Sequence, residues 1–212
     1  MVMITLLLFT SCQLGRFVFY NFADIKDYRK FKSRPLNASP IAFNFCSTEK
    51  GKFPKEIDNT TFDKYLENNK TVAFLIIKND TIQYEKYFKG YEQESIVPSF
   101  SMAKSISSIL IGCAIDDGLI KSVDESITNY IPELKKNGLE KVTIKHLLQM
   151  TSGIKFNESY INPFGDAASF YYGLNLRKQI AKMKLKHEPG KKFEYISGNT
   201  QLLGLVLERS LR

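Results

Sequence analysis

Residues 99–118 read SFSMAKSISSILIGCAIDDG, and this stretch organises the rest of the chain. From Ser101 onward, apolar residues recur at intervals of three and four, which predicts an α-helix. Gly118 follows two aspartates at the end of the pattern and is a favourable position for the helix to end. Because apolar residues occur on more than one side of this helix, we expect it to be central and buried.

Ser101 and Lys104 lie three residues apart at the start of this helix, so their side chains share one face. A serine hydroxyl is a weak nucleophile, and a lysine can activate it as a base when burial favours the neutral amine. The free N–H groups and the dipole at a helix start also favour a developing oxyanion. We therefore predict Ser101 as a nucleophile and Lys104 as its base. The alternative is an ordinary N-cap serine with a lysine that extends into solvent.

The Ser-x-x-Lys spacing alone is not specific, because the pairs Ser47/Lys50 and Ser152/Lys155 also have it. Ser47 lies in irregular sequence, before a glycine and a proline. Ser152 follows a predicted helix, at the end where the helix dipole has the opposite sign. Of these three serines, Ser101 alone combines the spacing with the start of an apolar helix.

The flanking sequence predicts a mixed α/β domain. Residues 71–88 form two β-rich runs joined by Asn-Asp, which indicates a β-hairpin. Further along, we predict a short helix at 143–150, capped by its threonine, and a long loop at 155–172. Two more helices are expected at 175–186 and 200–211.

Tyr195 is the candidate for a proton relay between the serine, the lysine and a leaving group. It lies in a turn-rich segment just before the last predicted helix, with Ser197 and Asn199 as polar neighbours. A similar short pattern occurs at Tyr160, so the pattern alone leaves open that either tyrosine serves only in packing.

The first twelve residues, MVMITLLLFTSC, form a short apolar run that ends in small residues. A bilayer core of about 30 Å needs roughly 20 helical residues, so this run does not predict a membrane-spanning helix. It resembles a bacterial lipoprotein signal, in which Cys12 becomes the lipidated first residue. We therefore expect a lipoprotein of the cell envelope, attached to the membrane only through Cys12. A buried N-terminal strand or a misassigned start, in a cytoplasmic protein, is the alternative.

The composition excludes several classes of protein. The chain has 212 residues, 43% of them hydrophobic and 25% charged, which indicates a folded protein rather than a disordered one. Its net charge is +8, but the lysines are spread along the chain and no nucleic-acid-binding motif is present, so we expect no nucleic-acid partner. The three cysteines and two histidines do not have the spacing of a zinc site, so we expect neither a metal nor another cofactor.

Six blocks in order, over roughly residues 71–212, together resemble the serine β-lactamase/penicillin-binding superfamily. Within it, they are most similar to class C β-lactamases, related esterases and 6-aminohexanoate-dimer hydrolases, the nylon-oligomer hydrolases. The blocks are Ser99–Ser105, Ala114–Leu119, Tyr130–Leu134, Thr143–Gly153, His187–Gly190 and Phe193–Gly204.

The resemblance implies a role for each site residue. Ser101 is similar to the acylated nucleophile, Lys104 to its base and Tyr195 to the relay tyrosine. The Tyr-x-Ser pattern and the segment around Tyr160 resemble the nylon-oligomer hydrolase branch. They imply that Tyr160, Ser197 and Asn199 bind the substrate. The two histidines, at positions 146 and 187, lie in blocks that look structural, so a core or turn role is expected for both.

The resemblance also implies an α/β (α+β) fold of the β-lactamase/transpeptidase type, with helices around an antiparallel sheet and a helical lobe. The family's third motif, a strand that follows the tyrosine motif, does not occur before Arg212. We therefore expect the C-terminal strands to be missing and the hairpin to keep an uncovered apolar face. The expected organisation is a signal at 1–12, a wrapping extension at 13–70 and part of the hydrolase domain at 71–212.

Two functions follow from these patterns. The first is a serine hydrolase that acts through an acyl-enzyme on a small amide, ester or lactam. The second is a non-catalytic, penicillin-binding-like module, or an inactive pseudoenzyme, that binds a cell-wall or acyl-peptide ligand.

Overall fold

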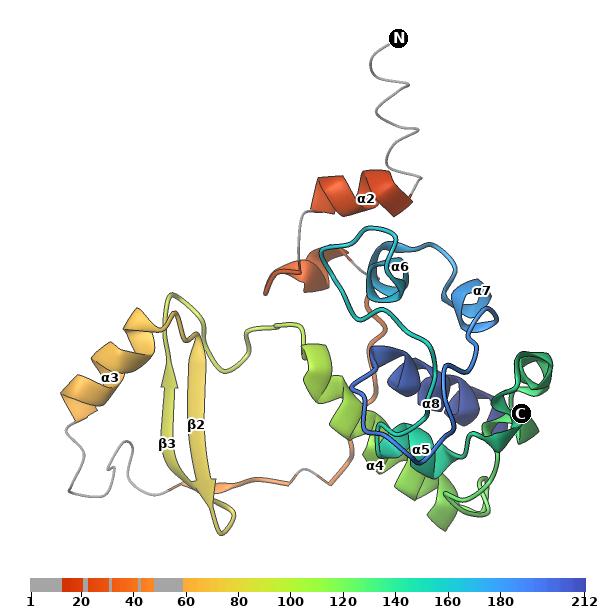
Figure 1. Cartoon of the computed structure of the whole chain (residues 1–212). Helices are drawn as coiled ribbons and strands as arrows, with labels where there is room; N and C mark the ends of the chain where they lie inside the picture. Colours follow the sequence, from red (N-terminus) through yellow and green to blue (C-terminus); the bar gives the residue numbers. More distant parts are fainter. Residues whose placement is uncertain (1–12, 21–22, 31, 42, 48–58) are drawn as a thin grey trace. The chain divides into compact units, whose positions relative to one another are not determined.

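The computed structural model describes residues 13–20, 23–30, 32–41, 43–47 and 59–212 (Figure 1). Residue contacts divide the chain into two compact units, one made of residues 25–98 and the other of residues 1–24 and 99–212. The strands are β1 (Cys46–Ser47), β2 (Ala73–Lys78) and β3 (Thr81–Tyr87). The helices are α2 (Gln13–Tyr20), α3 (Asn59–Asn68), α4 (Ala103–Asp116), α5 (Ile144–Leu148), α6 (Asp166–Tyr172), α7 (Leu176–Ile180) and α8 (Ser197–Ser210).

The smaller unit is built on the predicted hairpin. β2 and β3 pair antiparallel, and both turn residues, Asn79 and Asp80, have positive φ, as a tight hairpin turn requires. The two-residue strand β1, which the sequence did not indicate, pairs parallel to β3, so the sheet order is β1-β3-β2. The sheet is thus small and mainly antiparallel, with one short parallel edge.

Helix α3 covers one face of the hairpin. Its Leu66 packs with Tyr84 and Phe88 in a small buried cluster. On β2, the intervening residues Leu75 and Ile77 are exposed, because successive side chains of a strand point to opposite faces. Within the smaller unit, the described residues thus leave uncovered the apolar face that the sequence predicts.

The core of the larger unit lies where α4 and α5 pack against α8. Ile111 and Ala114 of α4 are buried in it, and Gly118 ends this helix with a left-handed φ of 72°. Within this unit, the prediction of a central, buried helix holds for one side of α4 only. Ile109, for example, is 63% exposed, because the described residues of the larger unit cover the opposite side of α4 incompletely.

The sequence predicts a long loop at 155–172, but only part of this segment is a loop. Its last seven residues form α6, in which Ala167, Ala168 and Tyr172 are buried. Conversely, the helix expected at 175–186 ends at Ile180, because residues 184–186 lie extended beside Gly153 and Ile154 and form backbone hydrogen bonds with that segment. The last helix begins three residues earlier than predicted, at Ser197.

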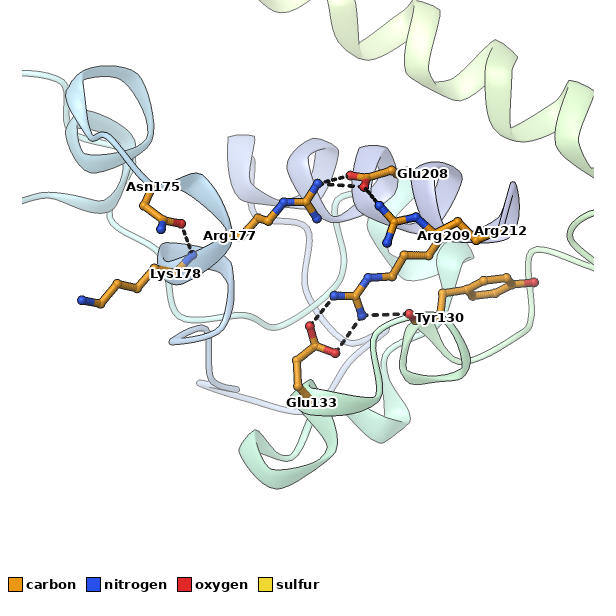
Figure 2. Close-up of polar contacts among 8 residues, drawn as sticks. All are labelled: Tyr130, Glu133, Asn175, Arg177, Lys178, Glu208, Arg209 and Arg212. Carbon is orange, nitrogen blue, oxygen red and sulfur yellow. Dashed lines mark hydrogen bonds and ion pairs between the residues drawn. The ribbon is translucent and has the colours of Figure 1, made fainter.

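The far end of α8 is held by ion pairs (Figure 2). Arg209 makes two hydrogen bonds with the carboxylate of Glu133, at 2.6 and 2.7 Å, and a third with the Tyr130 carbonyl. Glu208, which also lies on α8, forms ion pairs with Arg177 and with Arg212. A fork-shaped guanidinium fixes the direction of its partner, so this end of α8 is anchored to the segment around residue 133.

Candidate active site

Ser101 lies in a 3₁₀ turn, Phe100–Met102, that runs directly into α4. Phe100 has a φ of 43°, a left-handed conformation that a bulky residue adopts only when its surroundings impose it. Met102 occupies the N-cap position of α4, and no side chain caps the helix there. The alternative that Ser101 is an ordinary N-cap is therefore wrong, and its hydroxyl is available for other partners.

The hydroxyl oxygen of Ser101 accepts hydrogen bonds from two other side chains. Lys104 Nζ donates a hydrogen bond to it at 3.2 Å. The hydroxyl of Tyr195, 94 residues further along the chain, donates another at 3.0 Å. Lys104 Nζ also lies 5.1 Å from the centre of the Tyr195 ring. The structure thus brings together the three residues that the sequence singled out for catalysis.

The site is more open than the sequence suggested. Ser101 and Tyr195 are exposed, and Lys104 is half-buried. A fully buried helix start was expected to remove Lys104 from water. The difference arises because the first turn of α4 lines a cleft instead of entering the core.

Tyr195 is held in place by its two neighbours in the chain. The backbone N–H of Glu194 donates to the Met150 carbonyl at 2.8 Å, and the side chain of Ile196 is almost completely buried in the core. Fixing the residues on both sides limits the positions open to Tyr195. Packing thereby directs its phenol toward Ser101.

The pKa of the Tyr195 hydroxyl lies below its usual value of 10.0. The hydrogen bond with Ser101 is the largest cause, followed among the lowering effects by the hydrogen bond and positive charge of Lys104. Partial burial and the negative charge of Glu158 act in the opposite direction. A phenol with a lowered pKa gives up its proton more readily, which suits a group that relays protons.

The first turn of α4 borders a cleft of about 420 Å³. Most of its lining is apolar or aromatic, with a few hydroxyl and amide groups. Both Tyr160 and Ser197, predicted to bind substrate, contribute to it. The lining residues are Ala23, Phe100, Ser101, Ala103, Lys104, Tyr160, Ala167, Phe170, Tyr171, Ser197, Thr200 and Gln201.

Asn199 does not reach this cleft. Its side chain is completely buried, and its amide oxygen accepts a hydrogen bond from Ser152 at 2.7 Å. Its amide nitrogen lies 3.4 Å from the sulfur of Met150. Because both ends of the amide face the interior, the structure gives Asn199 a role in joining α8 to residues 150–152 rather than in contacting substrate. The resemblance indicated its position but not its orientation.

Glu158 is a site residue that no pattern in the sequence indicates. Its carboxylate accepts hydrogen bonds from the backbone N–H of Ser197, at 2.8 Å, and from the Ser197 hydroxyl. The hydroxyl of Tyr160 lies 3.5 Å from the same carboxylate. Since α8 has no side-chain cap of its own, Glu158 supplies one from a distant loop, at the end where the helix dipole favours a negative charge. No local pattern marks an acidic loop residue for such a role.

The two histidines have structural roles, as predicted. His146 forms a reciprocal capping box with Thr143, in which each side chain accepts from the other residue's backbone N–H. The ring of His187 lies 3.2 Å from the Glu194 carboxylate, next to the turn that leads to Tyr195. Both histidines thus stabilise segments that support the site.

Cys12, the predicted lipidation site, lies outside the described residues. Within those residues, no helix is both long and apolar enough to span a membrane. No group of three or more potential ligands among His, Cys, Asp and Glu is placed to bind a metal ion in the same described ranges.

The helices and the small sheet define a protein of the β-lactamase/transpeptidase fold. The profile of the Beta-lactamase family matches residues 59–211, and the chain therefore belongs to this family.

Two curated relatives illustrate this membership. A 6-aminohexanoate-dimer hydrolase of Paenarthrobacter ureafaciens is 27% identical over 165 residues, which is 69% of this chain and 40% of that protein. Protein flp of Staphylococcus aureus (strain COL) is 29% identical over 149 residues, which is 64% of this chain and 29% of that protein. The chain thus spans less than half the length of either relative.

Solved structures give the same fold. A Bacillus anthracis protein assigned as a 6-aminohexanoate-dimer hydrolase aligns with a TM-score of 0.61 and 24% identity, over 70% of this chain and 42% of that one. A mutant class C β-lactamase aligns with a TM-score of 0.56 and 17% identity, over 72% and 43% of the two chains. At these identities the likeness concerns the fold alone.

Proposed function

We propose that this protein is a serine hydrolase that acts through an acyl-enzyme on a small amide, ester or lactam. The observation that carries the proposal is the convergence on Ser101, whose hydroxyl lies 3.2 Å from Lys104 Nζ and 3.0 Å from the Tyr195 hydroxyl. Family membership supports the same chemistry. The substrate partner is a small molecule, and no step of the proposed reaction requires a cofactor.

In the first half of the reaction, Ser101 Oγ attacks the carbonyl carbon of the substrate while Lys104 takes the serine proton. A new bond forms between the serine oxygen and the carbonyl carbon. The bond from that carbon to the leaving amine or alcohol then breaks, and Tyr195 helps to return the proton to the leaving group. In the second half, water attacks the acyl-enzyme, releases the acid and restores the Ser101 hydroxyl.

The lining of the cleft favours a substrate whose acyl group carries no charge. Phe170, Tyr171 and three alanines provide apolar surface, and Lys104, the one cation among the described residues of the lining, donates a hydrogen bond to Ser101. Tyr160 and Ser197, which line the same cleft, are the proposed contacts with polar atoms of the substrate. A mostly apolar cleft with a few polar groups is typical of a small-molecule site.

A fluorescent acylating reagent tests the proposal on the whole chain. We expect it to label the wild-type protein and Ser105→Ala, which removes an exposed serine one turn further along α4, but not Ser101→Ala. Lys104→Ala should slow labelling by about 100-fold or more, the usual contribution of a general base. Labelling of Ser101→Ala at the wild-type rate would exclude this assignment. A stable adduct at Ser101 that is never released would instead favour the non-catalytic binding role.

A further inference from the structure

Helix α2 packs against the larger unit through Phe17, whose ring contacts that of Tyr172, and through two polar side chains. Gln13 Nε2 donates to the Pro163 carbonyl at 2.7 Å and to the Ser169 hydroxyl at 2.8 Å. Arg16 Nε donates to the Tyr172 carbonyl at 2.9 Å. In Figure 1, α2 lies alongside α6. The residues that would normally face water are thus used to attach the helix to the protein.

The apolar side chains of α2 mostly point outward. Val18 is 70% exposed and Phe19 is 68% exposed, and Leu14, one turn before Val18, is exposed too. A surface helix of a soluble protein ordinarily buries its apolar side and shows its polar side to water. On α2, by contrast, two polar residues face the protein and three apolar residues face outward, as expected for a helix whose outer side meets an apolar environment.

The loop that carries Pro163, the partner of Gln13, also exposes apolar side chains. Ile161 and Phe164 are both more than three-quarters exposed, and they flank Pro163, whose carbonyl binds Gln13. We call the five exposed side chains the α2 face: Leu14, Val18, Phe19, Ile161 and Phe164. Burying large apolar side chains away from water is favourable, so a surface of this kind is stabilised by an apolar partner.

We propose that the α2 face docks onto the surface of a lipid bilayer that contains anionic lipids. Cys12, the proposed site of lipid attachment, immediately precedes α2. The net charge of +8 favours an anionic surface.

Docking through the α2 face brings the cleft close to the lipid surface. Ala23, three residues beyond the end of α2, lines the cleft, and so does Tyr160, next to Ile161 of the same face. The entrance then lies where amphipathic or membrane-associated substrates are concentrated. This inference is independent of the reaction at Ser101, because it concerns binding to lipid and not turnover.

The absence of tryptophan from the sequence makes a direct test possible. Phe19→Trp introduces a single fluorophore on the α2 face, and Leu211→Trp places one at an exposed position at the end of α8 as the matched control. Both are made in the full chain with Cys12→Ser, so that no lipid is attached. The probes are vesicles of phosphatidylcholine alone and of phosphatidylcholine with phosphatidylglycerol.

We expect the emission of Phe19→Trp to shift to the blue with the anionic vesicles and that of Leu211→Trp to stay unchanged. Val18→Ser/Phe19→Ser should reduce co-sedimentation with the same vesicles by about tenfold or more, a loss of at least ~1.4 kcal/mol of binding free energy. The proposal is overturned if Phe19→Trp does not respond to vesicles, or if both tryptophans respond equally. A blue shift that depends on protein concentration without vesicles would overturn it in favour of a second copy of the chain.

Discussion

Tyr195 is the residue whose protonation the site changes most clearly. Its pKa lies below 10.0, first because of the hydrogen bond with Ser101 and then because of Lys104. Below the folded-state pKa, the folded and unfolded chains both carry the proton, and Tyr195 adds nothing to stability through this effect. Its contribution appears as the pH rises through the folded-state pKa and is complete above the unfolded value of 10.0.

We expect the ultraviolet difference titration between wild type and Tyr195→Phe to give a tyrosinate midpoint below 10.0. Ser101→Ala should raise this midpoint, and Lys104→Met should raise it as well, since each variant removes a group that favours the phenolate. A midpoint at or above 10.0 in the wild type would contradict the arrangement around Ser101.

Glu158 is expected to act as a positioning residue for the loop that carries Tyr160. Glu158→Gln keeps the shape of the side chain but removes the negative charge that caps α8 through Ser197. The loss of one charge-assisted hydrogen bond, roughly 1 kcal/mol, should raise KM about fivefold with a smaller change in kcat.

The pKa of Tyr195 provides a second measurement on Glu158→Gln, because a purely structural role of Glu158 would leave that pKa unchanged. Because the charge of Glu158 raises the pKa of Tyr195, Glu158→Gln should lower the tyrosinate midpoint further. Glu188→Gln, at an exposed turn position, is the control and should change neither value. An unchanged midpoint in Glu158→Gln would argue against this role.

The turn at Gly153 depends on the absence of a side chain. Gly153 has a φ of 69°, and a Cβ there would lie 2.3 Å from the His187 carbonyl oxygen. Gly153→Ala should lower the free energy of unfolding by about 3 kcal/mol, the sum of the left-handed strain and the steric overlap. Gly112→Ala, where a Cβ on α4 meets no atom within 4 Å, should instead raise it by about 0.5–1 kcal/mol. Urea unfolding measures both, and equal stability of the two variants would contradict the packing described.

Local patterns predicted the elements that have clear local causes. The hairpin, α4 and α5 follow from a tight turn, helical spacing and the Thr143 cap, and all three are found. The helix α6 was missed because its residues are aromatic and small, with no polar–apolar alternation, and burial of Ala167 and Ala168 stabilises it. α7 is shorter than its helical propensity suggests, because pairing of Leu185 with Ile154 competes with further helix.

The site depends on contacts that local spacing does not encode. Ser101 and Lys104 share a helix face and could be paired from their spacing, whereas Tyr195 joins them across 94 residues. Its inclusion came from the resemblance of the whole set of blocks. Glu158 and the inward orientation of Asn199 follow from three-dimensional packing, and neither had a signal in the sequence.

The pair Glu133–Arg209 links the end of α8 to the rest of the larger unit, as Figure 2 shows. The hydrogen bonds from Arg209 lower the pKa of Glu133 below its usual 4.5. The pair therefore contributes its full stability above pH 4.5 and loses it as the pH falls through the folded-state pKa.

Glu133→Gln should lower the free energy of unfolding by about 1 kcal/mol at neutral pH, a value kept small because the pair is partly exposed. The difference from wild type should vanish in acid below that folded-state pKa. Urea unfolding at neutral and acidic pH provides the comparison, with exposed Glu140→Gln as the control. A difference that persists unchanged in acid would contradict the assigned role of the charge.

The most direct measurement of the proposed chemistry is peptide mapping by mass spectrometry after brief incubation of the protein with a short-chain nitrophenyl ester. The acyl group should be found on the hydroxyl of Ser101, and it should disappear on longer incubation as water releases it. Its rate of formation should fall in Lys104→Ala and in Tyr195→Phe. An acyl group on a different residue, or none on a chain shown to be folded, would contradict the account.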